Sequence, residues 1–220
     1  MNIIAHRGIH NEAIPENSMK AFSLALKKNI PIEFDVHILK DKNIVVFHDD
    51  NLKRMTNKDK FIKECTYEEI KNLKLKNTNE NIPLLIDVLN LVNGKVLLDI
   101  ELKMDVQDHS LENELIKILK HYNGEVILKS FDYKKVLYLK KHTNYKVGLL
   151  IKRMNGFKDF IVRNINFNII IKPDFLACSK KMLDCRSVKQ FKKDIYIWTI
   201  KNKDEMKLYK ADYYISENVF

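Results

Sequence analysis

The sequence is poor in the residues that mark cross-linked, fibrous or disordered chains. Its 220 residues include only 5 Gly, 4 Pro and 3 Cys. So little Gly and Pro, together with 45% hydrophobic residues, excludes collagen-like, low-complexity and largely disordered chains. An odd number of cysteines without a Cys-x-x-Cys spacing indicates neither a disulfide framework nor a zinc site. The chain is therefore expected to form one globular domain over residues 1–220, with free thiols.

Long apolar runs and a secretion signal are also missing. No uninterrupted apolar stretch approaches the length of a membrane-spanning helix. The charged pair His6-Arg7 follows the N-terminus so closely that the basic and apolar regions of a signal peptide do not fit before it. We therefore expect a cytoplasmic protein without stable membrane insertion.

Positive charge is in excess, with 39 Lys and Arg against 29 Asp and Glu and a formal net charge of +10. The lysines are spread over many segments and alternate with apolar residues at helical spacing, which is typical of solvated helix faces. No helix-turn-helix, zinc-finger or RNA-binding aromatic motif accompanies them. We therefore expect no nucleic-acid partner, and a positive field that suits an anionic substrate.

Short β-rich runs alternate with amphipathic helical stretches along the chain. The patterns predict strands over residues 2–5, 31–36, 44–47, 96–102, 125–129, 145–150, 174–178, 195–200 and 211–215. They predict helices over residues 16–28, 85–92, 111–121, 133–142, 181–192 and 203–209. About eight strands, most of them followed by a helix, favour a parallel sheet that closes into an α/β fold, the (β/α)8 TIM barrel.

Two segments depart from this rhythm. Residues 51–81 are polar and rich in Lys and Asn, with one helix predicted over 67–73 behind a Thr66 and Glu69 capping box, which indicates a small insertion at the barrel rim. The sequence also stops at Phe220, soon after the last predicted strand. We expect a shortened or missing final helix, and an uncovered apolar strip there would favour a homo-oligomer.

Charged residues gather at the predicted strand ends. The clusters are His6-Arg7-Gly8, Glu33-Phe34-Asp35, His48-Asp49-Asp50 and Asp99-Ile100-Glu101-Leu102-Lys103. Residues two apart on a strand point to the same side, so the acids of each strand share a face. Charges that face into a barrel are costly unless they are paired or bind a metal, and barrel enzymes keep their active sites at the carboxyl ends of the strands. The four clusters therefore predict one active site.

The residue types indicate the chemistry of that site. The carboxylates Glu33, Asp35 and Glu101 form an oxygen-rich group suited to one hard divalent cation, Mg²⁺ or Ca²⁺. His6 and His48 can serve as general acid and general base near neutral pH.

Two cations complete the predicted site. Arg7 and Lys103 can hold a phosphate group and the charge that develops on it. A metal group, an acid/base pair and a phosphate clamp together predict phosphodiester cleavage.

An ordered set of motifs resembles the glycerophosphodiester phosphodiesterases, a family of phosphatidylinositol-phospholipase-C-like barrel enzymes. The matching runs are His6-Arg7-Gly8, Pro15-Glu16-Asn17-Ser18, Ile32-Glu33-Phe34-Asp35-Val36, Val45-Val46-Phe47-His48-Asp49, Ile100-Glu101-Leu102-Lys103, Ser130-Phe131-Asp132 and Trp198-Thr199-Ile200. The resemblance implies a TIM barrel with an insertion after the second histidine, and hydrolysis of glycerophosphodiesters to sn-glycerol 3-phosphate and an alcohol.

The resemblance also implies a role for each matching position. His6 and His48 would be the catalytic pair, and Trp198 would line the substrate pocket. The cation would be held by Glu33, Asp35 and Glu101, and the phosphate would be contacted by Arg7 and Lys103.

Two other functions stay open. A barrel phospholipase of the C or D type would act on membrane phospholipids, and a non-catalytic barrel would only bind its ligand. Within the favoured function, the sequence leaves open the alcohol headgroup, the choice between Mg²⁺ and Ca²⁺, which histidine is the acid, and whether water or a substrate hydroxyl is the nucleophile.

Overall fold

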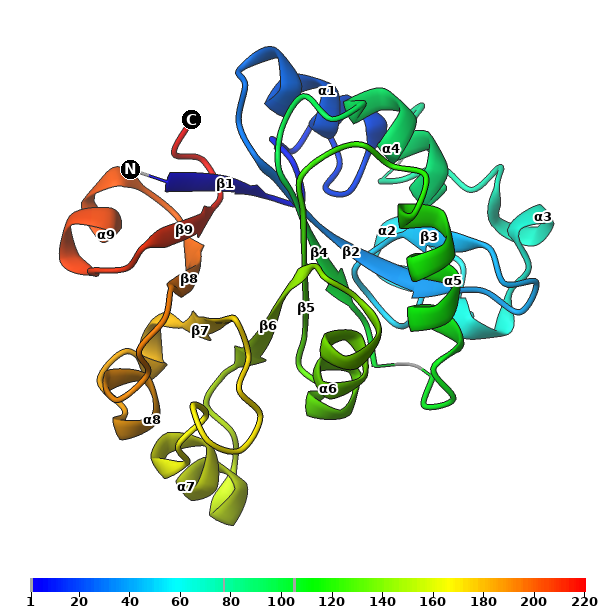
Figure 1. Cartoon of the computed structure of the whole chain (residues 1–220). Helices are drawn as coiled ribbons and strands as arrows, with labels where there is room; N and C mark the ends of the chain where they lie inside the picture. Colours follow the sequence, from blue (N-terminus) through cyan, green and yellow to red (C-terminus); the bar gives the residue numbers. More distant parts are fainter. Residues whose placement is uncertain (1, 77, 105) are drawn as a thin grey trace.

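The computed structural model describes residues 2–76, 78–104 and 106–220, and its strands form a closed barrel with helices outside (Figure 1). The strands are β1 Asn2–His6, β2 Ile32–Ile38, β3 Ile44–Val46, β4 Leu98–Leu102, β5 Val126–Ser130, β6 Lys146–Ile151, β7 Phe175–Ser179, β8 Ile195–Ile200 and β9 Tyr213–Ser216. All except β3 run parallel, and β1 closes the ring by pairing with both β2 and β9. The predicted (β/α)8 TIM barrel is confirmed.

One predicted strand lies outside the barrel wall. β3 pairs antiparallel with β2, with Val46 opposite Val36 and Ile44 opposite Ile38. Only residues 39–43 join the two strands, whereas a parallel crossover needs a dozen residues or more. β2 and β3 are therefore a hairpin, and its return leads the chain back toward the barrel mouth.

The helices are α1 Met19–Lys27, α2 Lys53–Thr56, η1 Ile62–Glu64, α3 Tyr67–Ile70, α4 Leu85–Val92, α5 Ser110–Leu119, α6 Tyr133–His142, α7 Gly156–Asn164, η2 Lys180–Met182, α8 Arg186–Lys189 and α9 Lys203–Leu208. The prediction of one helix over 181–192 is wrong, because the chain turns between η2 and α8. The sequence patterns missed α7. Its apolar residues Phe157, Phe160 and Ile161 stand three and four apart, a helical spacing that was available as a signal. All three are exposed, and the buried residue of α7 is the polar Asp159.

Along a strand, the side chains point alternately to the helical layer and to the barrel interior. On β2, Ile32, Phe34 and Val36 belong to the hydrophobic core that the strands share with α1, α4 and α5. Glu33 and Asp35 lie between them and point to the other side, into the barrel. The usual parallel strand is apolar on both faces, so this alternation marks a polar interior.

The opposite side of the barrel interior is apolar. Its buried residues are Ile4, Ile127, Leu150, Phe175, Ala177, Tyr196 and Ile215, which form one cluster. The Tyr196 ring stacks on Tyr213 with 4.2 Å between centroids and lies 4.4 Å from Phe175. Half of the barrel is therefore filled by packed side chains.

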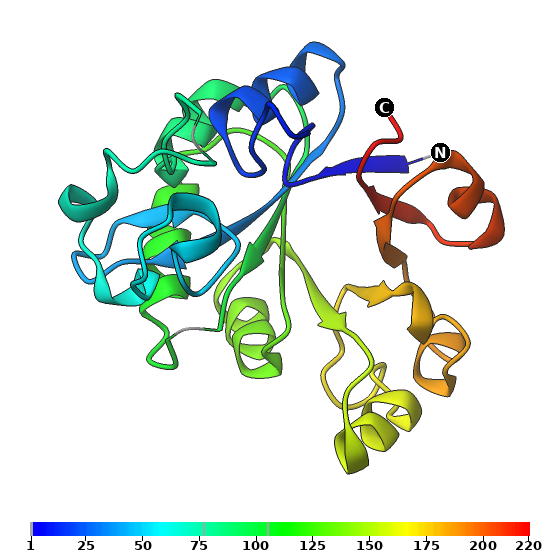
Figure 2. The same cartoon turned by 180° about the vertical axis from the view of Figure 1, so that it is seen from behind.

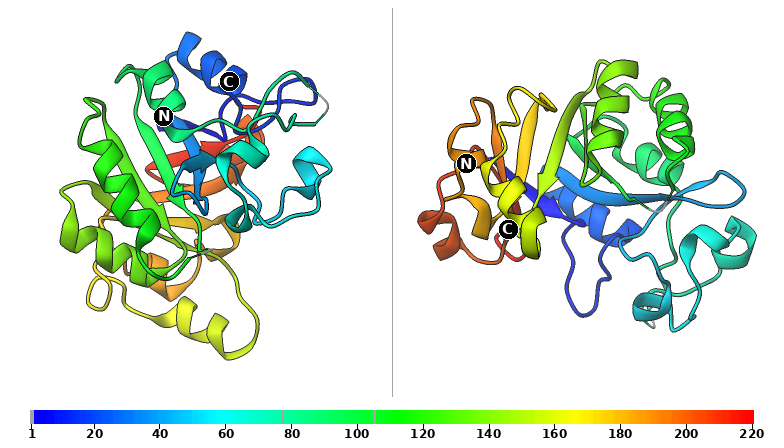
Figure 3. Two further views of the ribbon diagram at one scale, coloured as in Figure 1. Left: turned by 90° about the vertical axis from the view of Figure 1, so that its right-hand side faces the viewer. Right: turned by 90° about the horizontal axis from the view of Figure 1, so that it is seen from below.

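Residues 51–81 carry the short elements α2, η1 and α3 and stand out at one end of the barrel, in cyan tones (Figure 3). Leu52, Met55, Ile62 and Ile70 form a small core of this segment against the β2–β3 hairpin. The capping box of Thr66 and Glu69 is present, but the helix that it starts is α3, which ends at Ile70 rather than at residue 73.

The two ends of the chain lie close together (Figure 2). β1 pairs with β9, and the residues after β9 turn back so that Val219 and Phe220 line a hollow together with Asn2 and Ile3. Residues 217–220 contain no helix. Val219 packs against Tyr214 and its neighbours, and Phe220 packs against the main core, so the end of the chain covers part of the strip beside β9. No helix in the described residues has the length and apolar character needed to cross a membrane.

Candidate active site

Strand register brings the charged residues of three strands together. His6 on β1 lies opposite Glu33 on β2, and Glu33 lies opposite Asp99 on β4. One step further along, Asp35 lies opposite Glu101. The prediction that these clusters meet at one place in the barrel follows directly from parallel pairing without offset.

Two connected cavities open at this mouth. The inner cavity has a volume of about 180 Å³ and is lined by His6, Arg7, Glu33, His48, Glu101, Lys129, Phe131, Leu150, Lys152, Trp198, Thr199 and Ile215. The outer cavity, of about 650 Å³, is lined by His48, Asp49, Asp50, Phe61, Lys63, Glu101, Lys103, Met104, Phe131 and Lys152. All predicted site residues except Asp35, which is 1% exposed, line one of the two. Their catalytic and binding roles stay predictions.

The three predicted metal ligands lie together. One carboxylate oxygen of each of Glu33, Asp35 and Glu101 is within 4.8 Å of the others, and all three residues are buried. Asn17 donates a hydrogen bond from Nδ2 to Asp35 Oδ2 over 3.0 Å, which fixes that carboxylate. Three convergent carboxylates with little access to water fit a hard divalent cation.

Positive side chains neutralise these acids. Lys103 Nζ lies 2.7 Å from Asp35 Oδ1 and 2.8 Å from Glu101 Oε1. Burial alone would raise the pKa of Asp35, but the charges of Lys103 and Arg7 outweigh burial and hold it well below its usual range. Burial would lower the pKa of Lys103, and Asp35 and Glu101 raise it instead. The site is therefore a group of ions that hold each other charged.

Lys129 is a site residue that sequence reasoning missed. It is 1% exposed, and its Nζ lies 2.6 Å from Asp99 Oδ2 and 3.2 Å from Glu33 Oε1. Asp99 therefore supports Lys129 rather than Lys103. A signal existed, because Lys129 is the only charge in the apolar strand β5.

Arg7 reaches the site through an unusual backbone. Its φ is +55°, and its backbone N–H donates to Glu33 Oε2 over 3.0 Å. Its side chain donates to Glu16 Oε1 over 2.7 Å. The following Gly8 has φ +78°, and a Cβ there would meet Ala21 at 2.9 Å. Glycine therefore lets this turn lie against α1 and hold Arg7 in place.

His6 has a carboxylate partner that the sequence analysis did not identify. His6 Nδ1 lies 2.7 Å from Oε1 of Glu217, the first residue after β9. The hydrogen bond with His6 lowers the pKa of Glu217 more than burial raises it. This contact orients the ring and leaves Nε2 for a ligand. An acid directly after the last strand was the available signal.

His48 has a second and different partner. Its Nδ1 lies 2.6 Å from Asp49 Oδ1. Arg54 Nη2 donates to the same carboxylate over 2.9 Å, and it donates to Glu16 Oε1 over 2.7 Å. Glu16 thus joins Arg54 to Arg7, and the chain of contacts ties the His48 loop to the Arg7 loop.

Aromatic rings form the far wall. Trp198 meets Phe131 edge-on with 5.7 Å between centroids, and Lys152 Nζ lies 4.9 Å from the Phe131 centroid. The indole Nε1 of Trp198 is buried without a hydrogen-bond partner among the described residues. A donor in that state at a cavity wall suits an acceptor group on a ligand.

The mouth of this parallel barrel brings together two carboxylate-paired histidines, three convergent carboxylates and the cations Arg7 and Lys103. Such a fold and site are typical of a barrel phosphodiesterase. Residues 6–211 match the model of the Glycerophosphoryl diester phosphodiesterase family. The chain belongs to this family, and by that membership it is a glycerophosphodiester phosphodiesterase.

Known proteins are similar to this chain over nearly its full length. A glycerophosphodiester phosphodiesterase of Caldanaerobacter subterraneus is 34% identical over 227 aligned positions, covering 93% of this chain and 87% of the relative. A phosphodiesterase of Oleispira antarctica, solved with the product sn-glycerol-3-phosphate, superposes with a TM-score of 0.82 at 23% identity and covers 98% of this chain and 92% of its own. The glycerophosphodiester phosphodiesterase of Thermotoga maritima gives a TM-score of 0.76 at 24% identity, with 98% and 94% coverage.

Proposed function

We propose that the protein hydrolyses glycerophosphodiesters to sn-glycerol 3-phosphate and an alcohol, with one divalent cation and with His6 and His48 as the acid/base pair. The observation that carries the proposal is that both histidines line the inner cavity together with Glu33 and Glu101. The product held by the Oleispira antarctica enzyme, a protein of the same fold, agrees with this substrate class.

A cation, Mg²⁺ or Ca²⁺, would be held by Glu33, Asp35 and Glu101. Bound there, it supplies a Lewis acid for a phosphoryl oxygen. The three acids already face Lys103, Lys129 and Arg7, so this group of side chains is close to neutral. A divalent cation and an anionic phosphodiester can therefore enter together at little cost in net charge.

Arg7 and Lys103 would bind the phosphate. Arg7 lines the inner cavity and Lys103 lines the outer one, and both are held on the carboxylates beside it. Because their partners fix them before the substrate arrives, they lose little conformational entropy when they bind an oxyanion.

The histidines would move the protons. With Nδ1 on Glu217 or on Asp49, each ring has Nε2 free for the substrate side. One imidazole would take the proton from the attacking oxygen, which belongs to water or to a substrate hydroxyl whose cyclic product water then opens. The other, as imidazolium, would give a proton to the oxygen of the departing alcohol. The carboxylate behind each ring stabilises its charged form during this exchange.

The outer cavity offers room for the alcohol part. Its rim includes Phe61 and Lys63 of the 51–81 segment, which lie above the catalytic groups. The Phe131 and Trp198 rings form a wall that both apolar and cationic headgroups can contact.

The test is release of sn-glycerol 3-phosphate from a panel of glycerophosphodiesters with choline, ethanolamine or glycerol as the alcohol. We expect release that stops with a chelator and returns with Mg²⁺ or Ca²⁺, and no release by Asp35→Asn. Asn keeps the shape of the side chain and removes a ligand charge. Undiminished turnover after exhaustive chelation would refute the metal part, and no turnover with any substrate and metal would refute the activity.

A further inference from the structure

Exposed apolar side chains concentrate in the segment between β6 and β7. Six of the twelve large apolar side chains exposed in the described residues fall within residues 154–170. Two of them, Phe157 at 75% exposed and Phe160 at 63% exposed, are aromatic and lie on α7. Their rings stack with 6.1 Å between centroids. Helices on a barrel normally turn such residues inward, whereas α7 packs Val162 against the main core and leaves these two rings exposed.

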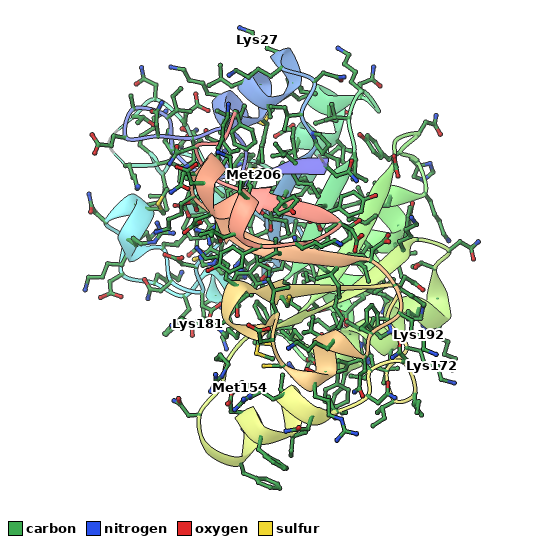
Figure 4. All side chains as sticks on the ribbon, turned by 90° about the vertical axis from the view of Figure 1, so that its left-hand side faces the viewer. Lys27, Met154, Lys172, Lys181, Lys192 and Met206 are labelled. Carbon is green, nitrogen blue, oxygen red and sulfur yellow. The ribbon has the colours of Figure 1, made fainter. Side chains whose placement is uncertain are left out.

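α7 stands away from the barrel. It packs against α8, and in side view it lies beyond every other element, with Met154 at its start (Figure 4). Asp159 is its one buried side chain and binds Arg153 over 2.8 Å, so a polar contact, rather than an apolar face, ties the helix to its preceding loop. The described part of the chain therefore leaves the Phe157 and Phe160 rings on α7 exposed, where another surface could cover them.

The active-site mouth carries exposed apolar residues on other loops. Phe61, 48% exposed, comes from the 51–81 segment, and Met104, 53% exposed, follows β4. Both line the outer cavity. Lys152 lines that cavity and also the shallow hollow beside Met154 and Phe157. We call Phe61, Met104, Met154 and Phe157 the apolar rim; it borders the opening through which substrate must pass.

Basic side chains surround this rim. Lys63 and Lys152 line the outer cavity, and Arg153 and Lys158 line the hollow next to it. Asp50 is the exposed acid at the cavity, and Asp159 is neutralised by Arg153. Apolar tips mixed with lysines and arginines complement an anionic lipid surface, where the tips enter the acyl boundary and the charges meet phosphates. A second copy of this chain would bring like charges together at the same face.

We infer that the apolar rim and α7 dock the protein peripherally on anionic phospholipid bilayers, with the active-site mouth turned toward the lipid. The inference goes beyond the proposed function, because it concerns where the enzyme sits rather than which bond it cleaves. Docking in this orientation would expose the site to glycerophosphodiesters that carry an acyl chain and stay in the membrane.

The test is sedimentation with vesicles and needs no turnover. We expect the protein to pellet with phosphatidylcholine vesicles that contain a quarter phosphatidylglycerol, to pellet poorly with pure phosphatidylcholine, and to be released by salt. The double variant Phe157→Ser with Phe160→Ser should bind at least tenfold more weakly, and Lys158→Glu should weaken binding further at low salt.

Controls separate docking from other effects. Leu208→Ser removes an apolar side chain that is 77% exposed on α9, and it should bind vesicles as the unaltered protein does. The α7 variants should keep their turnover of a water-soluble glycerophosphodiester. Equal pelleting of the α7 double variant and the unaltered protein would overturn the inference. A dimer in light scattering that the double variant dissociates would also overturn it, since the exposed face of α7 would then contact a second copy of the chain.

Discussion

The two sides of the barrel interior differ in their side chains, which are charged on one side and apolar on the other. The side formed by β1, β2 and β4 carries buried ions, with Glu33, Asp35 and Glu101 facing lysines and arginine. The side formed by β6–β9 carries stacked rings and aliphatic groups such as Phe175 and Tyr196. The charged side is shaped by mutual attraction and the apolar side by close packing. The apolar side excludes water, which strengthens every interaction across the mouth.

The largest difference between the two sides should be chemical. His6→Ala and His48→Ala should each lower kcat/KM by about 10³- to 10⁴-fold, because each removes a proton-transfer group. Steady-state turnover of a soluble glycerophosphodiester measures this loss, with circular dichroism to confirm folding. His121→Ala is the matched control, since His121 is exposed outside both cavities. A loss below tenfold would remove that histidine from the acid/base pair.

The ionic side should depend on its buried lysine for stability. Lys129→Met keeps most of the volume but leaves Asp99 and Glu33 without their cation, and it should lower the free energy of unfolding by about 3–5 kcal/mol. Urea denaturation measures the change. The same substitution at exposed Lys134 should cost less than about 0.5 kcal/mol. If Lys129→Met were as stable as the unaltered protein, the charged side would not be held by this ion cluster.

The carboxylate behind His6 should have a smaller effect. Glu217→Gln keeps a hydrogen bond but removes the charge that favours imidazolium, so kcat/KM should fall by about tenfold to 100-fold. The ratio of kcat/KM between Glu217→Gln and the unaltered protein should change with pH, because only the unaltered protein carries a charge at this position. Glu12→Gln, at an exposed acid, is the control. An unmoved pH profile with lowered activity would indicate that Glu217 acts only on structure.

The smallest effect should appear as acid sensitivity at the edge of the charged side. Burial raises the pKa of Glu16, but hydrogen bonds and charge from Arg54 and Arg7 outweigh it and lower the pKa to about 2. Because the folded pKa is depressed, the contribution of Glu16 to stability is fully present above about 4.5 and is lost as pH falls toward about 2.

In the Glu16→Gln variant, folding stability should therefore fall less steeply as the pH is lowered. The contribution is on the order of 1–2 kcal/mol once solvent screening of the partly exposed pair with Arg54 is allowed for. Thermal unfolding from pH 6 down to pH 2 measures it, with Glu12→Gln as the control. A variant with the same acid slope as the unaltered protein would contradict the pKa of Glu16.

Some elements could be predicted because their cause is local. The capping box at Thr66 and the alternation of Glu33 and Asp35 with apolar neighbours each express a short-range rule. The strand over 44–47 was assigned correctly, but its direction was not, since pairing partners are set by the length of the connection. α7 was missed although Phe157, Phe160 and Ile161 have helical spacing, and no local rule indicated that these side chains would face outward.

The residues of the site likewise fall into those that the sequence could predict and those that it could not. His6, Arg7, His48 and Lys103 stand in recognisable motifs at strand ends, so residue type and spacing were enough to select them. Glu217 follows β9 and Lys129 lies on β5, and neither is part of a motif that the sequence analysis used for the site. They join the site only because β9 closes on β1 and β5 lies beside β4.

The sequence by itself determined the barrel class, the family and the main chemical groups of the site, because these depend on periodicity and on motifs carried within single strands and loops. Only the tertiary structure decided which carboxylate serves which cation or histidine, that a hairpin brings His48 to the mouth, and that α7 turns its rings outward. Those outcomes depend on contacts between residues far apart in the chain, where register, closure of the barrel and burial select one arrangement among many.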